Sequence, residues 1–217
     1  MTSDPHRNQP LLRLGEPLNK AEGVMILLHG RGHSPEELFS LGEALGGSHL
    51  AYLAPTAAGR SWYPYSPLVA REQNEPYLSS AIARVQATTQ LAVAAGIPSS
   101  QILIVGFSQG ACLACEFVAR HPRRYAGLIS YRGGLIGPPD SALIYPGCLS
   151  GTPAFLGSGD PDQYVPWQRV QRSAEVLTLM GADVTTRRYP GMPQTISPAE
   201  IEAARQHIEV TLTQQPR

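Results

Sequence analysis

The sequence predicts an α/β fold with a mostly parallel central sheet and helices on both of its faces. Short continuous apolar runs, such as residues 23–28 and 101–106, are typical of strands that are buried on both sides. Segments with helical periodicity separate these runs, and an alternation of strands and helices favours parallel pairing. The 217 residues, of which 42% are hydrophobic and 16% charged, are enough to form the core of one domain.

The individual elements are expected in a regular order along the chain. Two helix starts carry a Ser-Pro-x-Glu capping pattern, which begins at Ser34 and again at Ser197. Residues 56–75 are rich in proline, glycine and aromatic residues and show no period. We expect a flexible N-terminus over residues 1–10 and a single domain over residues 11–217. Strands are predicted at residues 23–28, 50–54, 101–106, 125–130, 153–157 and 184–189, and helices from residue 35 and over residues 76–95, 111–120, 167–180 and 198–211.

Charge and cysteine content exclude several classes of function. The 17 basic and 17 acidic residues give a formal net charge of zero, so neither nucleic acid nor an anionic membrane is an expected partner. The number of cysteines is odd, and Cys112 and Cys115 fall on a predicted helix, which argues against a disulfide scaffold and for a reducing compartment. No partner CxxC or histidine pair has the spacing of a zinc site, so no metal is expected.

The polar start of the chain lacks the apolar stretch of a signal peptide, and no run is long enough to span a bilayer. We therefore expect a cytoplasmic protein.

The strongest motif is GFSQG, residues 106–110, which places Ser108 between a buried strand and a helix. A nucleophile elbow requires this context, because its glycines relieve crowding where the chain turns sharply. The serine hydroxyl then projects at the carboxyl end of the sheet. Ser108 is therefore the candidate nucleophile; the alternative is a serine that only caps the helix beginning near Gln109.

A second motif, HGRG at residues 29–32, follows the first buried strand. Glycine-rich loops at this place donate a backbone N–H to a developing oxyanion, together with the N–H that follows the nucleophile. The two donors would be those of Arg31 and Gln109. Taken alone, the loop is better explained as an ordinary turn, and the nearby GFSQG motif is what favours the oxyanion hole.

A third motif is the loop GDPDQYVP, residues 159–166, which also follows a predicted strand. An acid in this loop fits the chain order Ser, Asp, His of a catalytic triad, in which the acid orients the imidazole. Asp160 and Asp162 both fit the role, and either would also suit a turn.

Together, HGRG, GFSQG, the DxDxxVP loop and a closing YPGM segment resemble the phospholipase/carboxylesterase family, whose members include acyl-protein thioesterases and small bacterial carboxylesterases. The similarity extends from about Gly23 to Ile208. It implies an α/β-hydrolase fold, no cofactor, and hydrolysis of a small-molecule ester through an acyl-enzyme on Ser108. By the same resemblance, Asp162 takes the place of the triad acid and Asp160 supports the loop.

One residue departs from the family pattern where the catalytic base is expected. Relatives carry the histidine in a segment resembling YxGMxH, whereas this chain has Gln194 at that position. Glutamine has no proton to exchange near neutral pH and cannot act as a general base. Losing a triad base costs on the order of 10⁴ to 10⁶ in kcat. We therefore expect an impaired esterase, with a non-catalytic, ligand-binding pseudo-hydrolase as the alternative.

Other histidines are weak substitutes by sequence position. His33 lies just past the HGRG loop, at the same sheet edge as Ser108, and is the first candidate; a surface histidine is the simpler explanation. His207 falls inside the last helix, and the others are expected to be peripheral: His6, His49 and His121.

Aromatic residues suggest where the substrate would lie. Trp62 and Tyr63, in the irregular region, and Trp167, after the acid loop, are expected to contact an acyl or aryl group, with simple packing as the alternative. Arg132 is expected to face the surface. The oligomeric state stays open, a homodimer included.

Overall fold

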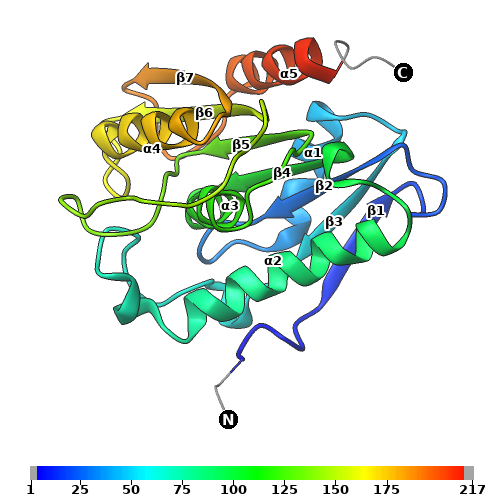
Figure 1. Ribbon diagram of the computed structural model, residues 1–217, viewed down its shortest axis with the longest axis horizontal. Coiled ribbons are helices and arrows are strands. Elements are labelled where there is room, and N and C mark those ends of the chain that lie inside the picture. Colours follow the sequence, from blue (N-terminus) through cyan, green and yellow to red (C-terminus); the bar gives the residue numbers. More distant parts are fainter. Residues whose placement is uncertain (1–3, 213–217) are drawn as a thin grey trace.

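The computed structural model describes residues 4–212, which form a seven-stranded sheet flanked by helices (Figure 1). The strands lie in the spatial order β1, β3, β2, β4, β5, β6, β7. They are β1 (Leu11–Gly15), β2 (Gly23–Leu28), β3 (Leu50–Pro55), β4 (Ile102–Phe107), β5 (Gly127–Tyr131), β6 (Pro153–Asp160) and β7 (Asp183–Pro190). The helices are α1 (Phe39–Leu45), α2 (Tyr77–Ala94), α3 (Gln109–Arg120), α4 (Trp167–Leu179) and α5 (Pro198–Leu212), with short 3-10 turns η1 (Pro35–Leu38), η2 (Ala58–Arg60), η3 (Arg71–Asn74) and η4 (Ser99–Gln101).

The predicted mostly parallel sheet is confirmed. Every neighbouring pair of strands is parallel except β1 and β3, which are antiparallel. The sequence did not predict β1, because this edge strand is half-buried or exposed along its whole length and so lacks a continuous apolar run.

Of the N-terminus that the sequence predicts to be flexible, residues 1–3 lie outside the described residues, and residues 4–10 pack against the domain. The side chain of His6 is fully buried and both of its ring nitrogens have partners. Its Nδ1 accepts the Ala58 N–H at 3.0 Å, and its Nε2 lies 2.9 Å from the Trp62 carbonyl oxygen. Burial lowers the pKa of His6, which fits a neutral ring. His6 is therefore a structural anchor and not a peripheral residue.

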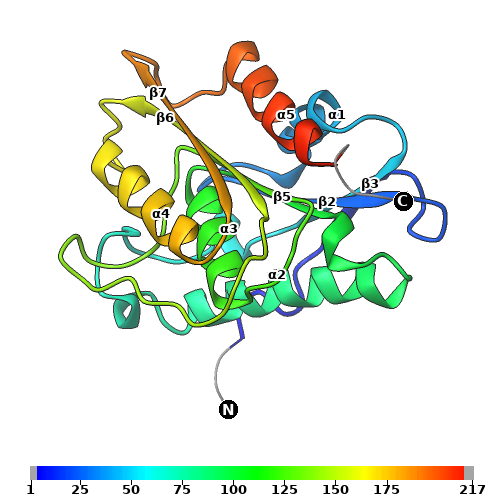
Figure 2. The same cartoon turned by 45° about the horizontal axis from the view of Figure 1, so that its top comes forward.

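Side chains of the strands alternate between two apolar clusters, one on each face of the sheet. In β2, Val24, Ile26 and Leu28 belong to the first cluster, while Met25 and Leu27 belong to the second. The first face is covered by α2, α3 and α4, and the second by α1 and α5 (Figures 1 and 2). Within residues 4–212, none of the helices combines the length and apolar character needed to cross a membrane.

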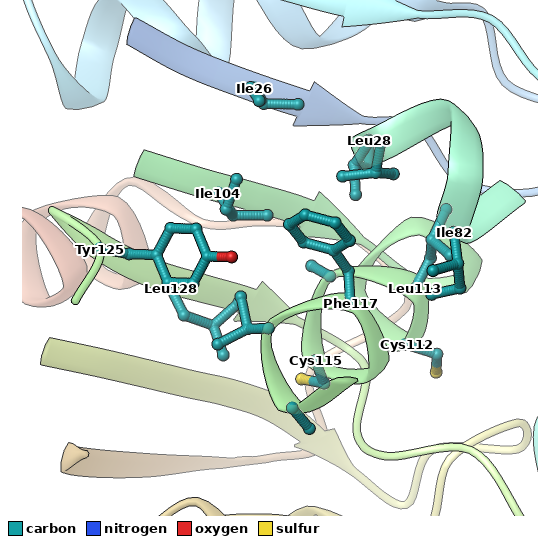
Figure 3. Packing of buried hydrophobic residues seen from close by; sticks show 14 of the residues in the cluster. Ile26, Leu28, Ile82, Ile104, Cys112, Leu113, Cys115, Phe117, Tyr125 and Leu128 are labelled. Carbon is teal, nitrogen blue, oxygen red and sulfur yellow. The ribbon is translucent and has the colours of Figure 1, made fainter. Parts of the chain in front are cut away.

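Helix α3 packs across the middle of the first face (Figure 3). Leu113 and Phe117 of this helix lie against Leu28 of β2 and Ile104 of β4, and all four side chains are fully or almost fully buried. Because α3 begins directly after β4, this packing fixes the direction of the turn between them.

The carboxyl ends of the parallel strands meet at one edge of the sheet, and a crevice is expected where the strand order reverses. The chain continues from β2 outward to β3, and then crosses back to β4 on the other side of β2. The loops after β2 and β4 therefore leave the sheet in opposite directions. The HGRG and GFSQG motifs are these two loops, and the ends of β6 and β7 bring the two remaining motifs to the same edge.

Candidate active site

Ser108 occupies a strained turn between β4 and α3. Its φ of 54° and ψ of −117° lie in a region that residues with a Cβ rarely adopt. The turn requires glycine two positions before and two positions after the serine, because the backbone leaves no room for a Cβ there. A Cβ on Gly106 would stand 2.3 Å from the Gly110 carbonyl oxygen, and one on Gly110 would stand 2.0 Å from the Leu28 carbonyl oxygen. This is the geometry that an exposed nucleophile requires.

The two candidate oxyanion donors border the same cavity as Ser108. Arg31 follows β2 and Gln109 opens α3, and both line the cavity. Gln109 lies in the first turn of its helix, where backbone N–H groups have no intrahelical acceptor. The structure thus brings Arg31, Ser108 and Gln109 together at one cavity.

His29, at the start of the HGRG loop, is held as a neutral structural residue. Its Nδ1 lies 2.8 Å from the Gly30 carbonyl oxygen, and its Nε2 accepts the Ala57 N–H at 3.1 Å. Burial lowers the pKa of the ring. Since both nitrogens are used, His29 has no free lone pair for a proton of Ser108.

The acid loop separates the roles of its two aspartates. Asp160 forms an ion pair with the exposed Arg188 of β7. Asp162 Oδ1 accepts the N–H groups of Tyr164 and Val165 at 2.8 and 2.9 Å. Its Oδ2 is buried and has no hydrogen-bond partner among the described residues. Asp162 therefore presents one unused acceptor, whereas Asp160 is already paired.

Gln194 lies in the loop between β7 and α5 and reaches Ser108. Its Nε2 donates to Ser108 Oγ at 3.3 Å, and the residue lines the same cavity. The amide therefore lies within hydrogen-bond distance of the hydroxyl, which it can hold but whose proton it cannot remove.

Arg132 corrects a sequence prediction, because it is fully buried and does not face the surface. It forms an ion pair with Glu200, which is also buried, and its Nη2 donates to the Thr195 carbonyl oxygen at 2.6 Å. Glu200 Oε2 in turn accepts the Ser197 N–H at 2.9 Å. A charge in this position needs such partners, because an unpaired buried charge is costly. Arg132 bonds to Thr195 and Glu200 bonds to Ser197, so the ion pair fixes both ends of residues 195–197, which follow Gln194.

The cavity at this edge has a volume of about 460 Å³. Of the three aromatic residues expected to contact the substrate, Tyr63 lines the cavity, whereas Trp62 and Trp167 do not. Trp62 is fully buried, with its indole N–H donating to the His29 carbonyl oxygen at 2.8 Å, and Trp167 packs against the first apolar cluster. The residues lining the cavity are Arg31, His33, Tyr63, Pro64, Tyr65, Ser66, Pro67, Phe107, Ser108, Gln109, Cys112, Tyr164, Val165 and Gln194.

The aromatic wall of the cavity, residues 61–67, is held by side chains and not by regular secondary structure. The Gln109 amide accepts the Trp62 N–H at 2.8 Å and donates to the Tyr63 carbonyl oxygen at 2.7 Å. The guanidinium of Arg31 donates to three consecutive carbonyl oxygens, those of residues 63–65. Buried Asn74 adds a bond to the N–H of Tyr65 at 2.8 Å. Side-chain bonds from three separate segments therefore hold the wall in place.

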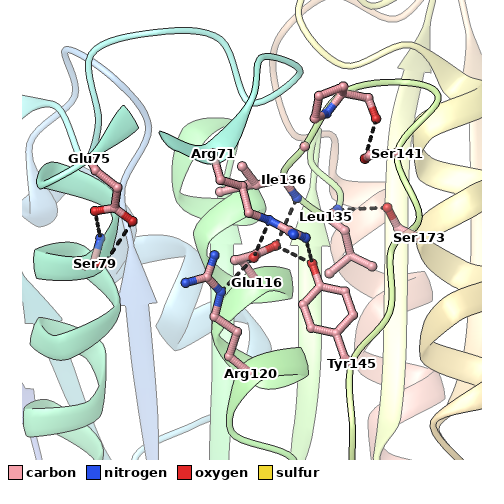
Figure 4. Close-up of polar contacts among 12 residues, drawn as sticks. Arg71, Glu75, Ser79, Glu116, Arg120, Leu135, Ile136, Ser141, Tyr145 and Ser173 are labelled. Carbon is pink, nitrogen blue, oxygen red and sulfur yellow. Dashed lines mark hydrogen bonds and ion pairs between the residues drawn. The ribbon is translucent and has the colours of Figure 1, made fainter. Parts of the chain in front are cut away.

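A buried carboxylate stabilises the loops beside this wall (Figure 4). Glu116 of α3 pairs with Arg71 and Arg120, and it also accepts the Tyr145 hydroxyl and the Ile136 N–H. Since Arg71 comes from η3, and Ile136 and Tyr145 come from the long loop after β5, the network ties both segments to α3.

Cys112 lies on the cavity wall one helical turn after Ser108, yet it is expected to be chemically inert. Burial raises the pKa of its thiol to about 11 and that of Cys115 to about 12, so both stay protonated at neutral pH.

Cys148, in contrast to these two cysteines, is exposed. Iodoacetamide at pH 8 is therefore expected to alkylate Cys148 about 10²-fold faster than Cys112 or Cys115 in the native protein. Intact mass followed by peptide mapping measures these rates; rapid native labelling of Cys112 would contradict the expectation.

The sheet order and the strained serine turn define the class: the chain has an α/β-hydrolase fold. The family model described as Phospholipase/Carboxylesterase matches residues 12–212, and the chain belongs to this family. The resemblance inferred from the motifs is thereby confirmed.

Individual relatives agree with this assignment. A crystal structure of a phospholipase/carboxylesterase from Dyadobacter fermentans superposes with a TM-score of 0.89 at 40% identity, covering 93% of this chain and 97% of that one. A probable carboxylesterase from Oryza sativa is 27% identical over 88% of this chain and 89% of its own length. Acyl-protein thioesterase 1 from Saccharomyces cerevisiae is 25% identical over 93% of this chain and 98% of its own.

Proposed function

We propose that this chain hydrolyses a small uncharged carboxylic ester through an acyl-enzyme on Ser108, at a rate far below that of a complete triad. The observation that carries the proposal is the strained turn at Ser108, which opens onto a cavity of about 460 Å³ bordered by Arg31 and Gln109. Strain of this kind is retained where it serves a function. The names of the relatives, carboxylesterases and acyl-protein thioesterases, support ester or thioester chemistry.

In the proposed reaction, Ser108 Oγ attacks the carbonyl carbon and the N–H groups of Arg31 and Gln109 stabilise the resulting oxyanion. The tetrahedral species collapses, the alcohol leaves, and water then releases the acid from the serine. The wall of Tyr63, Pro64 and Tyr65 would contact the acyl or aryl group, since fixed aromatic walls of this kind suit apolar ligands. The three free cysteines are consistent with a reducing location such as the cytoplasm.

A second candidate, a non-catalytic pseudo-hydrolase that binds an ester or acid, is favoured by one observation. Gln194 donates to Ser108 Oγ at 3.3 Å, so one lone pair of the nucleophile is already engaged. In that case the cavity would bind ligands without turnover.

Replacement of Ser108 by alanine distinguishes the two candidates. Ser108→Ala is expected to reduce hydrolysis of p-nitrophenyl acetate and butyrate to the background rate, because no other acyl acceptor lies in the turn. The chain as it stands should also form a covalent adduct with an alkyl fluorophosphonate, detected by intact mass and absent in Ser108→Ala. Ser79→Ala, an exposed serine at the start of α2, is the matched control. Equal turnover in Ser108→Ala and the unmodified chain would refute the acyl-enzyme, and ligand binding without any serine-dependent turnover would favour the pseudo-hydrolase.

A further inference from the structure

A serine esterase without the usual histidine needs another base, and one histidine lies in the right place. Of the six histidines in the sequence, all within the described residues, only His33 lines the cavity that contains Ser108. His6 and His29 use both ring nitrogens in hydrogen bonds. The remaining three lie toward the opposite edge of the sheet, near strand starts or at the end of α3: His49, His121 and His207.

His33 is oriented as a catalytic histidine would be. Its Nδ1 lies 2.6 Å from Glu37 Oε2, and the carboxylate is itself fixed because Oε1 accepts the Ser34 N–H at 2.9 Å. The hydrogen bond to His33 is the main reason why the pKa of Glu37 is lowered, so the carboxylate is charged at neutral pH. The ring also packs edge-on against Phe107, with centroids 5.6 Å apart. A carboxylate at Nδ1 places the proton there and leaves the lone pair on Nε2, as in a triad.

The imidazole and the serine share the space above Gly30. A Cβ on that glycine would stand 3.2 Å from His33 Cδ2 and 3.4 Å from Ser108 Cβ, so both residues border the space that a side chain at position 30 would fill. Cδ2 is bonded to Nε2, which places the free lone pair at this edge of the ring. Proton transfer between a base and a hydroxyl can pass through one bridging water molecule.

The hydrogen bond from Gln194 determines where the Ser108 hydroxyl proton can point. Because its Nε2 donates to Ser108 Oγ, the hydroxyl proton of the serine points to a different acceptor. Gln194 and His33 also border a neighbouring cavity of about 360 Å³, so the two residues share the lining of both cavities.

We propose that His33, oriented by Glu37, acts as the general base of this site through one water molecule; the proposal rests on the proposed esterase function. In acylation the Ser108 hydroxyl gives its proton to the water, which gives one to His33 Nε2, while Oγ bonds to the carbonyl carbon. The protonated imidazole returns that proton to the departing alkoxide. In deacylation His33 takes a proton from the attacking water, the bond to Oγ breaks, and the proton passes back to the serine. Each cycle consumes one ester and one water and yields one acid and one alcohol.

The test compares His33→Gln with Glu37→Gln and with the exposed control His49→Gln. His33→Gln is expected to lower kcat for p-nitrophenyl acetate by about 10²-fold with KM nearly unchanged, because a positioned base contributes on that scale. The rate of fluorophosphonate labelling of Ser108 should fall by a similar factor. Glu37→Gln should lower kcat less, since glutamine keeps the capping interaction with Ser34 and loses only the charge. Exogenous imidazole should restore part of the rate in His33→Ala.

Measuring His33→Gln again in the Gln194→His variant distinguishes a catalytic role of His33 from a structural role in its loop. When Gln194→His supplies a second base beside Ser108, the loss caused by His33→Gln should shrink to less than about 3-fold. An equal loss in both backgrounds would overturn the proposal, because it would indicate a structural role. Serine-dependent turnover that His33→Gln leaves intact would overturn it as well, while the esterase function would stand. Turnover that survives Ser108→Ala would instead refute the proposed function itself.

Discussion

Gln194→His is expected to raise kcat for a short aryl ester by about 10⁴-fold, the usual scale of a triad base. The surroundings already suit an imidazole. The side chain at position 194 stands 3.3 Å from Ser108 Oγ, within reach for proton transfer. Asp162 Oδ2 is buried without a partner, so it can accept the Nδ1–H of a histidine. Under the proposed assignment, the substitution would complete a triad with Ser108 and Asp162.

Three variants test this expectation in parallel assays of p-nitrophenyl acetate hydrolysis. Gln194→Asn is the matched control, because it keeps an amide and should show no gain. The gain should vanish when Gln194→His is combined with Ser108→Ala. Combined with Asp162→Asn, it should fall by several orders of magnitude, since the wrong tautomer of the histidine is then favoured. If Gln194→His stays as slow as the unmodified chain, the assignment of Ser108, Asp162 and position 194 to one catalytic unit is wrong.

The parallel sheet could be predicted because strands buried on both faces leave continuous apolar runs in the sequence. The same logic located the candidate site, since parallel strands bring their carboxyl ends together; Arg31, Ser108, Gln109 and Gln194 all line one cavity. The edge strand β1 could not be found in this way, because its exposure removes the apolar run.

The lining of the cavity was harder to predict, because it depends on tertiary hydrogen bonds. Trp62 and Tyr65 come from one short aromatic segment without periodicity, yet Trp62 points into the core and Tyr65 lines the cavity. Hydrogen bonds with Gln109 and Arg31, which are distant in the sequence, decide which of these aromatic side chains is buried and which lines the cavity. Arg132 could not be predicted as buried for the same reason, since its partner Glu200 lies 68 residues further along the chain.

The buried ion pair of Arg132 and Glu200 is expected to contribute strongly to the stability of the fold. Glu200→Ala is expected to lower the free energy of unfolding by about 3 to 5 kcal/mol, because it leaves the Arg132 guanidinium buried without its counter-charge. The melting temperature should fall by about 10 °C for a chain of this size. Chemical denaturation and thermal unfolding, both followed by circular dichroism, measure the loss.

Two controls isolate the cause. Arg172→Ala breaks an exposed ion pair with Glu175 and should cost less than about 1 kcal/mol. The double variant Arg132→Met with Glu200→Leu removes both charges and should recover much of the loss, although the bonds to Thr195 and Ser197 stay broken. An equal loss in the single and double variants would mean that those loop contacts, and not the ion pair, hold the segment after Gln194. In either case the loop that positions residue 194 depends on the packing beneath it, so Glu200→Ala made in the Gln194→His background should also lower the restored kcat.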